Sequence, residues 1–191
     1  MGKRLKFTID DQCGNYWCWA AVAVGVSKYY SRSSPWTQCG VANALFEYKN
    51  LFKKYKVKDC CKNPDKCDHP ENLENALTCT QNYAGKSHIK KSSDGKFPQE
   101  LFEEVCREID KRRPVAARIG LEGGGGHFVV IYGYETVTHD PQSPYFVAAD
   151  PYYVIHSTMP VSENYGDYNK HDKGWGVIDG RWTDIFFTKG E

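Results

Sequence analysis

The sequence contains no hydrophobic run that could cross a membrane and no excess of either charge. None of the apolar stretches in its 191 residues approaches the roughly 18 residues that a transmembrane helix needs. Lysine and arginine number 25, aspartate and glutamate number 24, and the formal net charge is +1. This balance predicts that neither nucleic acid nor an anionic membrane is the main partner. The short lysine runs, such as residues 53–56, are typical of a solvated face.

The start of the chain also lacks the pattern of a secretory signal. Residues 1–6 are basic, but no long apolar run with a small-residue cleavage site follows them directly. The apolar residues 20–26 come too late and lead into the polar pair Ser27 and Lys28. We therefore expect no signal peptide in this chain. Repeats and low-complexity segments are absent as well, and the length favours a single domain over residues 1–191.

Eight cysteines are present, but they form no recognisable zinc pattern. Cys60 and Cys61 are adjacent rather than spaced as C-x-x-C, and no second pair stands at zinc-ribbon distance. The cluster of Cys60, Cys61, Cys67 and Cys79 can hold a disulfide, a metal ion or neither. Free thiols in a reduced compartment are the expected state, and one disulfide after export is the alternative. We expect no metal and no other cofactor.

The periodicity of the apolar residues changes near residue 113. Before it the pattern favours helices, and the helical half is expected at about 12–113. Helices are predicted over residues 18–30, 38–49, 73–77 and 98–112, with a loop at 59–72 and a turn at 92–95. The first of these helices is apolar on nearly every side, which is typical of a buried central helix.

Strands dominate the second half of the chain, at about 114–191. They are predicted over residues 115–119, 128–134, 145–149, 153–156 and 182–187. Helices first and strands later predict an α+β fold with antiparallel pairing.

The first segment with a chemical signature leads from Gln12 into the helix that begins near Cys18. A cysteine at a helix N-terminus faces unpaired N–H groups and the positive end of the dipole, which favour a thiolate. The same N–H groups can donate to a developing oxyanion, and Gln12 is close enough across a turn to aim its amide there. The segment alone fits equally well a small buried thiol with no chemical role.

The second segment places His127 after four glycines and at the mouth of a strongly apolar strand. A base that works on a thiol needs a fixed backbone beneath it and an open side in front. The strand supplies the backbone and the glycines supply the opening, although a core histidine after a flexible linker fits the pattern too. The remaining histidines lack this setting and are expected to be surface or structural residues: His69, His88, His139, His156 and His171.

Asp150 ends an apolar strand that can pair across a hairpin with the strand of His127. Its carboxylate would then accept the imidazole N–H and fix the tautomer and orientation of the ring. Asp140 is a rival, but it falls in the expected hairpin turn. Taken alone, Asp150 also fits a simple turn residue before proline.

Together, Gln12, Cys18, His127 and Asp150 resemble the papain-like cysteine peptidases in their order and setting. The similarity is closer to the bacterial branch, which includes leader-removing peptidase domains of bacteriocin exporters, effector proteases injected into plant cells and interbacterial toxin proteases. The matching stretches cover most of residues 12–151, and no motif is found beyond about residue 157. They are Gln12, residues 17–21, 29–30 and 38–43, residues 126–134, and Asp150 with Pro151.

The resemblance implies a papain-like fold, with a central helix carrying Cys18 in the helical half and an antiparallel β half. It implies that Cys18 attacks a peptide carbonyl, that His127 acts as base and then acid, and that Asp150 orients His127. Gln12 and the Cys18 N–H would bind the oxyanion. Trp17 would form a wall of the substrate site, with Gly125 and Gly126 admitting the substrate backbone. Tyr16 departs from the small residue that many plant and animal members have at this position.

The expected function is a cysteine endopeptidase acting on protein substrates, with a preference for small residues such as Gly-Gly before the cut. The family analogy further suggests a secreted or delivered effector or toxin, with an immunity or inhibitor protein as a partner. Two alternatives stay open at this point. One is a transglutaminase or deamidase acting on protein glutamines, and the other is a binding module that has lost catalysis.

Overall fold

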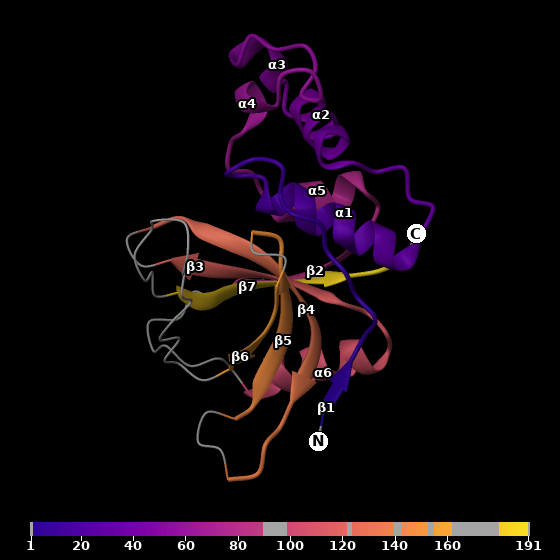
Figure 1. Cartoon of the computed structure of the whole chain (residues 1–191), viewed down its shortest axis with the longest axis vertical. Coiled ribbons are helices and arrows are strands. Elements are labelled where there is room, and N and C mark those ends of the chain that lie inside the picture. Colours follow the sequence, from indigo (N-terminus) through magenta and orange to yellow (C-terminus); the bar gives the residue numbers. More distant parts are fainter. Residues whose placement is uncertain are drawn as a thin grey trace.

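Helices cover both faces of one antiparallel sheet in this protein (Figure 1). The computed structural model describes residues 2–89, 99–121, 124–139, 143–152, 155–161 and 180–190. The predicted α+β class with antiparallel strands is confirmed. The predicted turn at 92–95 and the rival Asp140 lie outside the described residues.

Seven strands form the sheet within the described residues, in the order β2-β7-β3-β4-β5-β6, with β1 paired to β4. Their bounds are β1 Gly2–Arg4, β2 Tyr83–Ile89, β3 Val115–Leu121, β4 Gly126–Glu135, β5 Tyr145–Asp150, β6 Ile155–Pro160 and β7 Gly180–Thr188. The helices are α1 Cys18–Tyr30, α2 Gln38–Tyr48, α3 Leu51–Lys54, α4 Pro64–Cys67, α5 Leu73–Cys79 and α6 Gln99–Asp110. None of the described helices has both the length and the apolar character that a membrane span requires.

Alternation along the central strands builds one hydrophobic core on each face of the sheet. Ala116 of β3 and Val130 of β4 belong to the core shared with α1, α2 and α5. Their neighbours Ala117 and Val129 belong to the opposite core, which α6 closes with Phe102, Val105 and Ile109. Successive strand residues point to opposite faces, so two helical layers can pack on one sheet.

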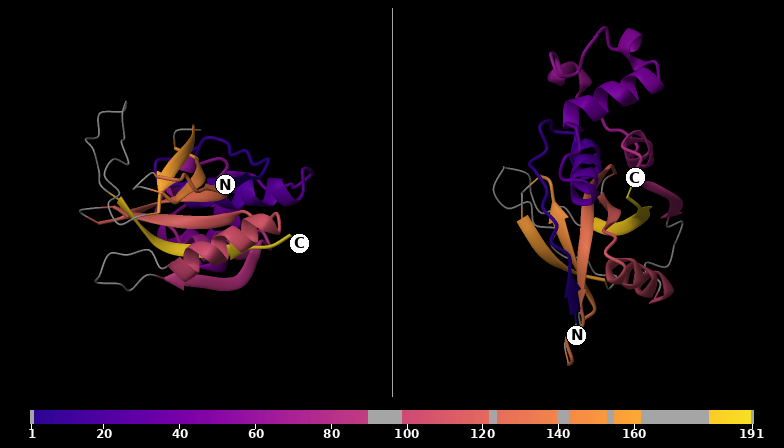
Figure 2. Two further views of the ribbon diagram at one scale, coloured as in Figure 1. Left: turned by 90° about the horizontal axis from the view of Figure 1, so that it is seen from below. Right: turned by 90° about the vertical axis from the view of Figure 1, so that its right-hand side faces the viewer.

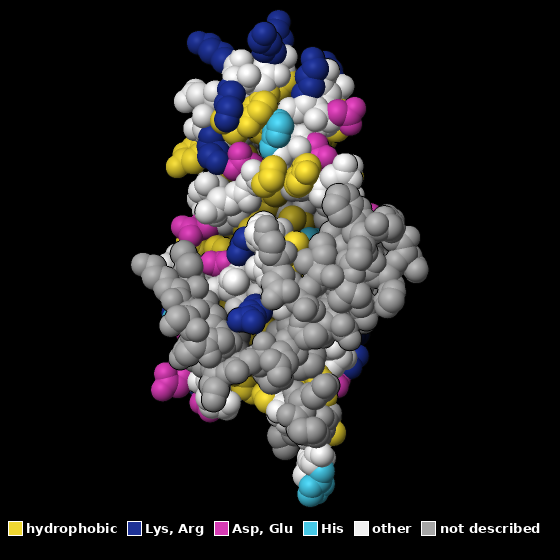
Figure 3. All heavy atoms as spheres, turned by 90° about the vertical axis from the view of Figure 1, so that its left-hand side faces the viewer, with side chains coloured by type: hydrophobic (Ala, Val, Ile, Leu, Met, Phe, Trp, Pro, Cys, Tyr) yellow, Lys and Arg dark blue, Asp and Glu magenta, His cyan; other side chains and the backbone are white. Residues whose placement is uncertain are grey.

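Helix α1 begins at Cys18 and ends at Tyr30, the range that the apolar pattern predicted. Its residues from Cys18 to Ser27 are all buried, because α2 and α5 flank it and β4 lies beneath it. Helices α2, α3 and α4 lie at the end of the molecule away from β1 (Figures 1 and 2). Lysine and arginine side chains gather at the tip of this lobe (Figure 3), where Lys53, Lys54 and Lys56 are exposed as predicted.

The division into a helical half and a β half is not clean. Strand β2 comes from the segment predicted to be helical and pairs with β7 at the edge of the sheet. Its residues Ala84, Gly85 and Lys86 are exposed, so this edge strand carries no apolar alternation that the sequence could reveal. Strand β1 and the short helices α3 and α4 were not predicted either.

The expectation of free thiols in the cysteine cluster is wrong for three of its four members. Cys39 is bonded to Cys61, and Cys60 to Cys67, with Cα separations of 4.9 and 5.6 Å. These separations are ordinary for disulfides. Because the chain around residue 60 folds back onto α2, adjacent cysteines reach different partners. Cys13, Cys18, Cys79 and Cys106 are free thiols.

Candidate active site

Cys18 is the first residue of α1, and its side chain is nearly buried. The N-cap residue Trp17 makes no side-chain capping bond, and the first turn contains no acidic residue. The N–H groups at this helix end are therefore not neutralised by a capping side chain from Trp17. These N–H groups and the positive end of the helix dipole can stabilise a negative charge that develops close to this helix end during a reaction.

His127 lies at the start of β4 and Asp150 at the end of β5. The two strands pair antiparallel, with Val130 opposite Ala149, so both side chains reach the same end of the sheet. The His127 Nε2 atom lies 2.8 Å from the Asp150 Oδ1 atom. Asp150 is fully buried and also accepts the backbone N–H of Tyr152 at 2.7 Å. A buried carboxylate held by two donors can fix the direction of the imidazole ring.

The charge state of His127 is set by its two neighbours. Burial alone lowers the pKa of His127, but the Asp150 carboxylate raises it, as does a hydrogen bond with the Cys18 side chain. The net result is a pKa raised to about 10. Because Nε2 faces Asp150, Nδ1 is the ring nitrogen that is left for proton exchange with sulfur. Thiol, imidazole and carboxylate thus lie in contact in that order.

The loop that leads to Cys18 is fastened from two sides. Gln38, at the start of α2, accepts the Cys13 N–H at 2.8 Å and donates to the Asp11 carbonyl at 2.7 Å. On the other side, the indole N–H of Trp17 donates to the carbonyl of Cys67 at the end of α4, and that of Trp19 donates to the carbonyl of His69, which follows α4. This fastening explains how a loop of turn-forming residues can present a nucleophile at a fixed position.

Gln12 lies in this loop, but its amide is used differently from the prediction. Its Nε2 atom donates to the carbonyls of Gly14 at 2.7 Å and Asn15 at 2.9 Å. An amide has two N–H donors, so both are engaged within the loop. The Oε1 atom is buried and has no hydrogen-bond partner among the described residues. In this conformation Gln12 braces the loop, and an oxyanion role requires one donor to be released.

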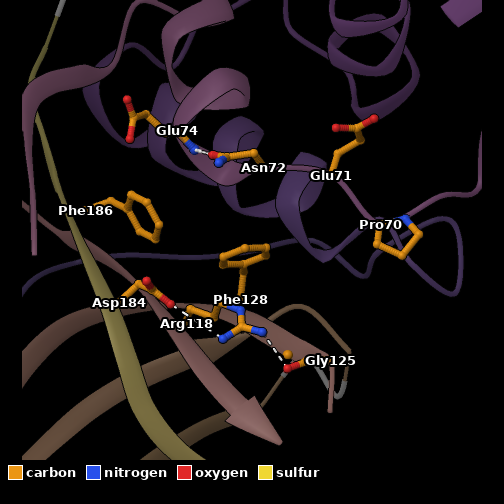
Figure 4. A pocket seen from close by; sticks show the side chains of 10 residues that line it. Pro70, Glu71, Asn72, Glu74, Arg118, Gly125, Phe128, Asp184 and Phe186 are labelled. Atoms are coloured by element: carbon orange, nitrogen blue, oxygen red, sulfur yellow. Dashed lines mark hydrogen bonds and ion pairs between the residues drawn. The ribbon is translucent and has the colours of Figure 1, made fainter. Parts of the chain in front are cut away.

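A pocket of about 530 Å³ (Figure 4) is lined in part by Gly126 and Phe128, the two residues that flank His127 in β4, whereas neither His127 nor Cys18 belongs to its lining. Its lining includes Gly125 and Gly126, which the sequence predicted, together with Phe128, Phe186 and Arg118, which it did not. The phenyl rings form an apolar surface between the sheet and α5 (Figure 4). No local pattern distinguishes two strand phenylalanines as pocket residues, because the same residue type fills the core elsewhere.

The two glycines of the pocket lie in different surroundings. Gly125 has φ +84°, a conformation that glycine adopts without strain. A Cβ on Gly126 would lie 2.4 Å from the Arg118 Nε atom, so the guanidinium occupies that space. Arg118 in turn binds Thr183 at 2.9 Å and forms an ion pair with Asp184 at 3.6 Å.

The predicted substrate-contact role of Trp17 is not favoured by its position. Trp17 is only 1% exposed and donates to the Cys67 carbonyl at 2.9 Å. Two of the histidines expected to be surface or structural residues make contacts with neighbouring side chains. The His69 ring stacks on Tyr55 at a centroid distance of 3.9 Å, and His88 Nε2 lies 3.0 Å from the Glu104 carboxylate. Among the described residues, no three His, Cys, Asp or Glu side chains are arranged to hold a metal ion.

An α+β fold with a thiol at a helix N-terminus, facing an imidazole and a buried carboxylate, is an arrangement suited to nucleophilic thiol chemistry. The model of the Peptidase_C39 like family matches residues 4–175. The chain belongs to this family, and the membership supports a cysteine peptidase, a hydrolase of peptide bonds. The match extends beyond residue 157, where the sequence analysis found no motif. No curated protein matches the chain significantly.

Proposed function

We propose that this chain is a cysteine endopeptidase in which Cys18 is the nucleophile, His127 the proton carrier and Asp150 the residue that positions His127. The observation that carries the proposal is the continuous series of contacts from the Cys18 sulfur through the His127 ring to the Asp150 carboxylate. Each member has the chemistry its place requires: a polarisable nucleophile, a base that can return its proton, and a fixed acceptor.

In the proposed reaction, the Cys18 thiolate attacks the carbonyl carbon of the scissile bond, and protonated His127 lies beside the sulfur. The resulting oxyanion is stabilised by the Cys18 N–H and by the Gln12 amide once one of its loop contacts is released. His127 then gives its proton to the departing amine, and a thioester remains on Cys18. Water then attacks the thioester while neutral His127 accepts its proton, which releases the acid product and restores the thiolate beside protonated His127.

The substrate proposed is an unfolded or extended protein segment with small residues, such as Gly-Gly, before the scissile bond. Gly125 supports this, because no side chain rises from the backbone at this edge of the pocket. We further propose a secreted or delivered effector or toxin, with an immunity or inhibitor protein as partner. The two disulfides support export, since such bonds persist in oxidising environments.

The proposal is tested by incubating wild-type protein and Cys18→Ala with a cell lysate and mapping new peptide N-termini. New termini are expected with wild type and not with Cys18→Ala. Cys106→Ala is the matched control, because Cys106 is a free thiol on α6 and far along the chain from the site. A cleavage profile dominated by large side chains before the cut would remove the Gly-Gly preference.

The same lysate separates the alternative activities by mass. Hydrolysis of a peptide bond adds one water and yields two pieces, whereas deamidation of glutamine adds about one mass unit to an intact chain. A transglutaminase would join two chains instead. An inert thiol at Cys18, slow to react with iodoacetamide near neutral pH, would indicate a binding module.

A further inference from the structure

The carboxylate of Asp68 accepts hydrogen bonds from the backbone of the loop that ends at Cys18. Asp68 lies between α4 and α5, more than 45 residues from the loop in sequence. Its Oδ2 atom accepts the Asn15 N–H at 2.9 Å, and its Oδ1 atom accepts the Tyr16 N–H at 2.8 Å. We propose that Asp68 is a positioning residue for the nucleophile, a role that rests on the proposed function of Cys18.

The neighbours of Asp68 contact the same stretch of chain. The Cys67 carbonyl accepts the Trp17 indole N–H at 2.9 Å, and the His69 carbonyl accepts the Trp19 indole N–H at 3.0 Å. Three consecutive residues, 67–69, therefore accept four hydrogen bonds from residues 15–19. Cys18 lies inside this bonded stretch, so any shift of the segment moves the sulfur.

The loop approaches Asp68 as closely as its backbone allows. A Cβ on Gly14 would lie 2.6 Å from the Asp68 Oδ1 atom, so only glycine permits this contact without displacement. Residues 67–69, which accept these hydrogen bonds, are themselves held in place, because Cys67 is disulfide-bonded to Cys60 and His69 stacks on Tyr55. The contact therefore joins a loop that has no side chain at Gly14 to an aspartate whose neighbour Cys67 is held by a disulfide.

Geometry and charge make opposite predictions for the carboxylate of Asp68. Charge-assisted hydrogen bonds to two consecutive N–H groups order the loop that precedes α1. The negative charge of Asp68, however, lies near the helix end where Cys18 begins α1, and it opposes a second anion there. We assign the benefit of Asp68 to geometry, since a displacement of about 1 Å at a reacting atom can cost about 100-fold in rate.

The test compares Asp68→Ala and Asp68→Asn with wild type, using Asp65→Ala as the matched control. Asp65 is an exposed residue in the first turn of α4, three residues before Asp68. At a temperature where circular dichroism shows each variant folded, Asp68→Ala is expected to lower kcat about 10- to 100-fold with little change in KM. Asp68→Asn keeps one acceptor oxygen and a similar shape, so its loss is expected to be smaller and its folding safer.

The decisive readout is the pH dependence of Cys18 alkylation by iodoacetamide, followed by mass spectrometry. A loosened loop separates the sulfur from protonated His127, so the midpoint of alkylation in Asp68→Ala is expected to move to higher pH. If Asp68 acted only through its charge, the midpoint would move to lower pH. If Asp68 had a purely structural role, the midpoint of alkylation would stay unchanged in the folded protein. A midpoint that is unchanged or that moves to lower pH overturns the inference.

Alkylation needs no substrate, which separates this inference from the proposed function. If wild type cleaves no protein but the alkylation midpoint still rises in Asp68→Ala, the peptidase proposal fails and the positioning role stands. If wild type is active and Asp68→Ala keeps both its kcat and its alkylation midpoint, only the positioning role fails.

Discussion

The backbone N–H of Gln12 donates a hydrogen bond of 2.8 Å to the carbonyl of Pro151. Gln12 begins the loop that leads to Cys18, and Pro151 directly follows Asp150 at the end of β5. This one bond ties the segment of the nucleophile to the segment of the carboxylate without using any reacting side chain. The relative position of Cys18 and Asp150 is therefore set by the backbone, and substitutions of the reacting side chains should leave the frame in place.

Replacement of Asp150 should lower turnover more than it disturbs substrate binding. Asp150→Ala removes the acceptor of the His127 Nε2 proton, so the ring loses both its orientation and the charge that raises its pKa. We expect kcat to fall about 100- to 10,000-fold. Asp150→Asn can still accept a hydrogen bond and should retain more activity. Steady-state kinetics on a cleaved peptide measures kcat and KM for both variants.

Asp110→Asn is a suitable comparison for these Asp150 variants, because Asp110 is an exposed carboxylate that pairs with Lys3 at the far end of α6. Its kcat should match wild type. A wild-type kcat in Asp150→Ala would mean that another group orients His127.

The stability of the protein should depend on pH through His127. Its pKa is raised from an unfolded value of about 6.5 to about 10 in the fold. Protonated His127 therefore stabilises the folded state fully below pH about 6.5, and this contribution disappears as pH rises toward about 10. Urea unfolding of wild type and His127→Ala at several pH values measures the contribution. The difference in unfolding free energy should narrow from pH 6 to pH 10, and a constant difference would contradict the raised pKa.

Much of this site could be expected from the sequence, for local reasons. The apolar period that marks α1 and the apolar run of β4 both survive in the fold, because burial follows the same periodicity that the sequence displays. Cys18 and His127 stand at the ends of these two elements. A residue at the end of a strongly patterned element can be located without knowing what surrounds it.

The supporting contacts could not be expected, because they depend on tertiary folding. Asp68 bonds to backbone N–H groups more than 50 residues earlier, and nothing in the types of the two segments signals the pairing. The partners of Cys60 and Cys61 depend on how the chain folds back onto α2. The amide of Gln12 could be assigned to a loop, but not to the carbonyls it meets there.

The two disulfides should differ in their effect on catalysis although both support the fold. Replacing either pair by serines should cost about 2–4 kcal/mol in unfolding free energy. Only the Cys60→Ser, Cys67→Ser variant should also lower kcat, because Cys67 carries the carbonyl that holds Trp17. The Cys39→Ser, Cys61→Ser variant is the matched control. Variants are preferable to a reducing agent, which would also keep Cys18 reduced. Equal kcat values in the two folded variants would show that the Cys60–Cys67 disulfide has no effect on the active site beyond its contribution to stability.

Gln12 should affect both loop stability and turnover if its amide serves first the loop and then the oxyanion. Gln12→Ala removes two hydrogen bonds to loop carbonyls, which should cost about 1–3 kcal/mol in unfolding free energy. It also removes the proposed oxyanion donor, so kcat should fall about 100- to 1,000-fold. Urea unfolding and steady-state kinetics on the same preparations measure the two effects separately.

The comparison that isolates the oxyanion role uses Gln38→Ala. Gln38 braces the same loop through Asp11 and Cys13 but comes from α2, so its loss should weaken the loop without removing an oxyanion donor. If Gln12→Ala and Gln38→Ala lose similar stability, a much lower kcat in Gln12→Ala alone assigns the difference to the oxyanion. Equal kcat values would confine Gln12 to bracing the loop and leave the Cys18 N–H as the remaining proposed donor.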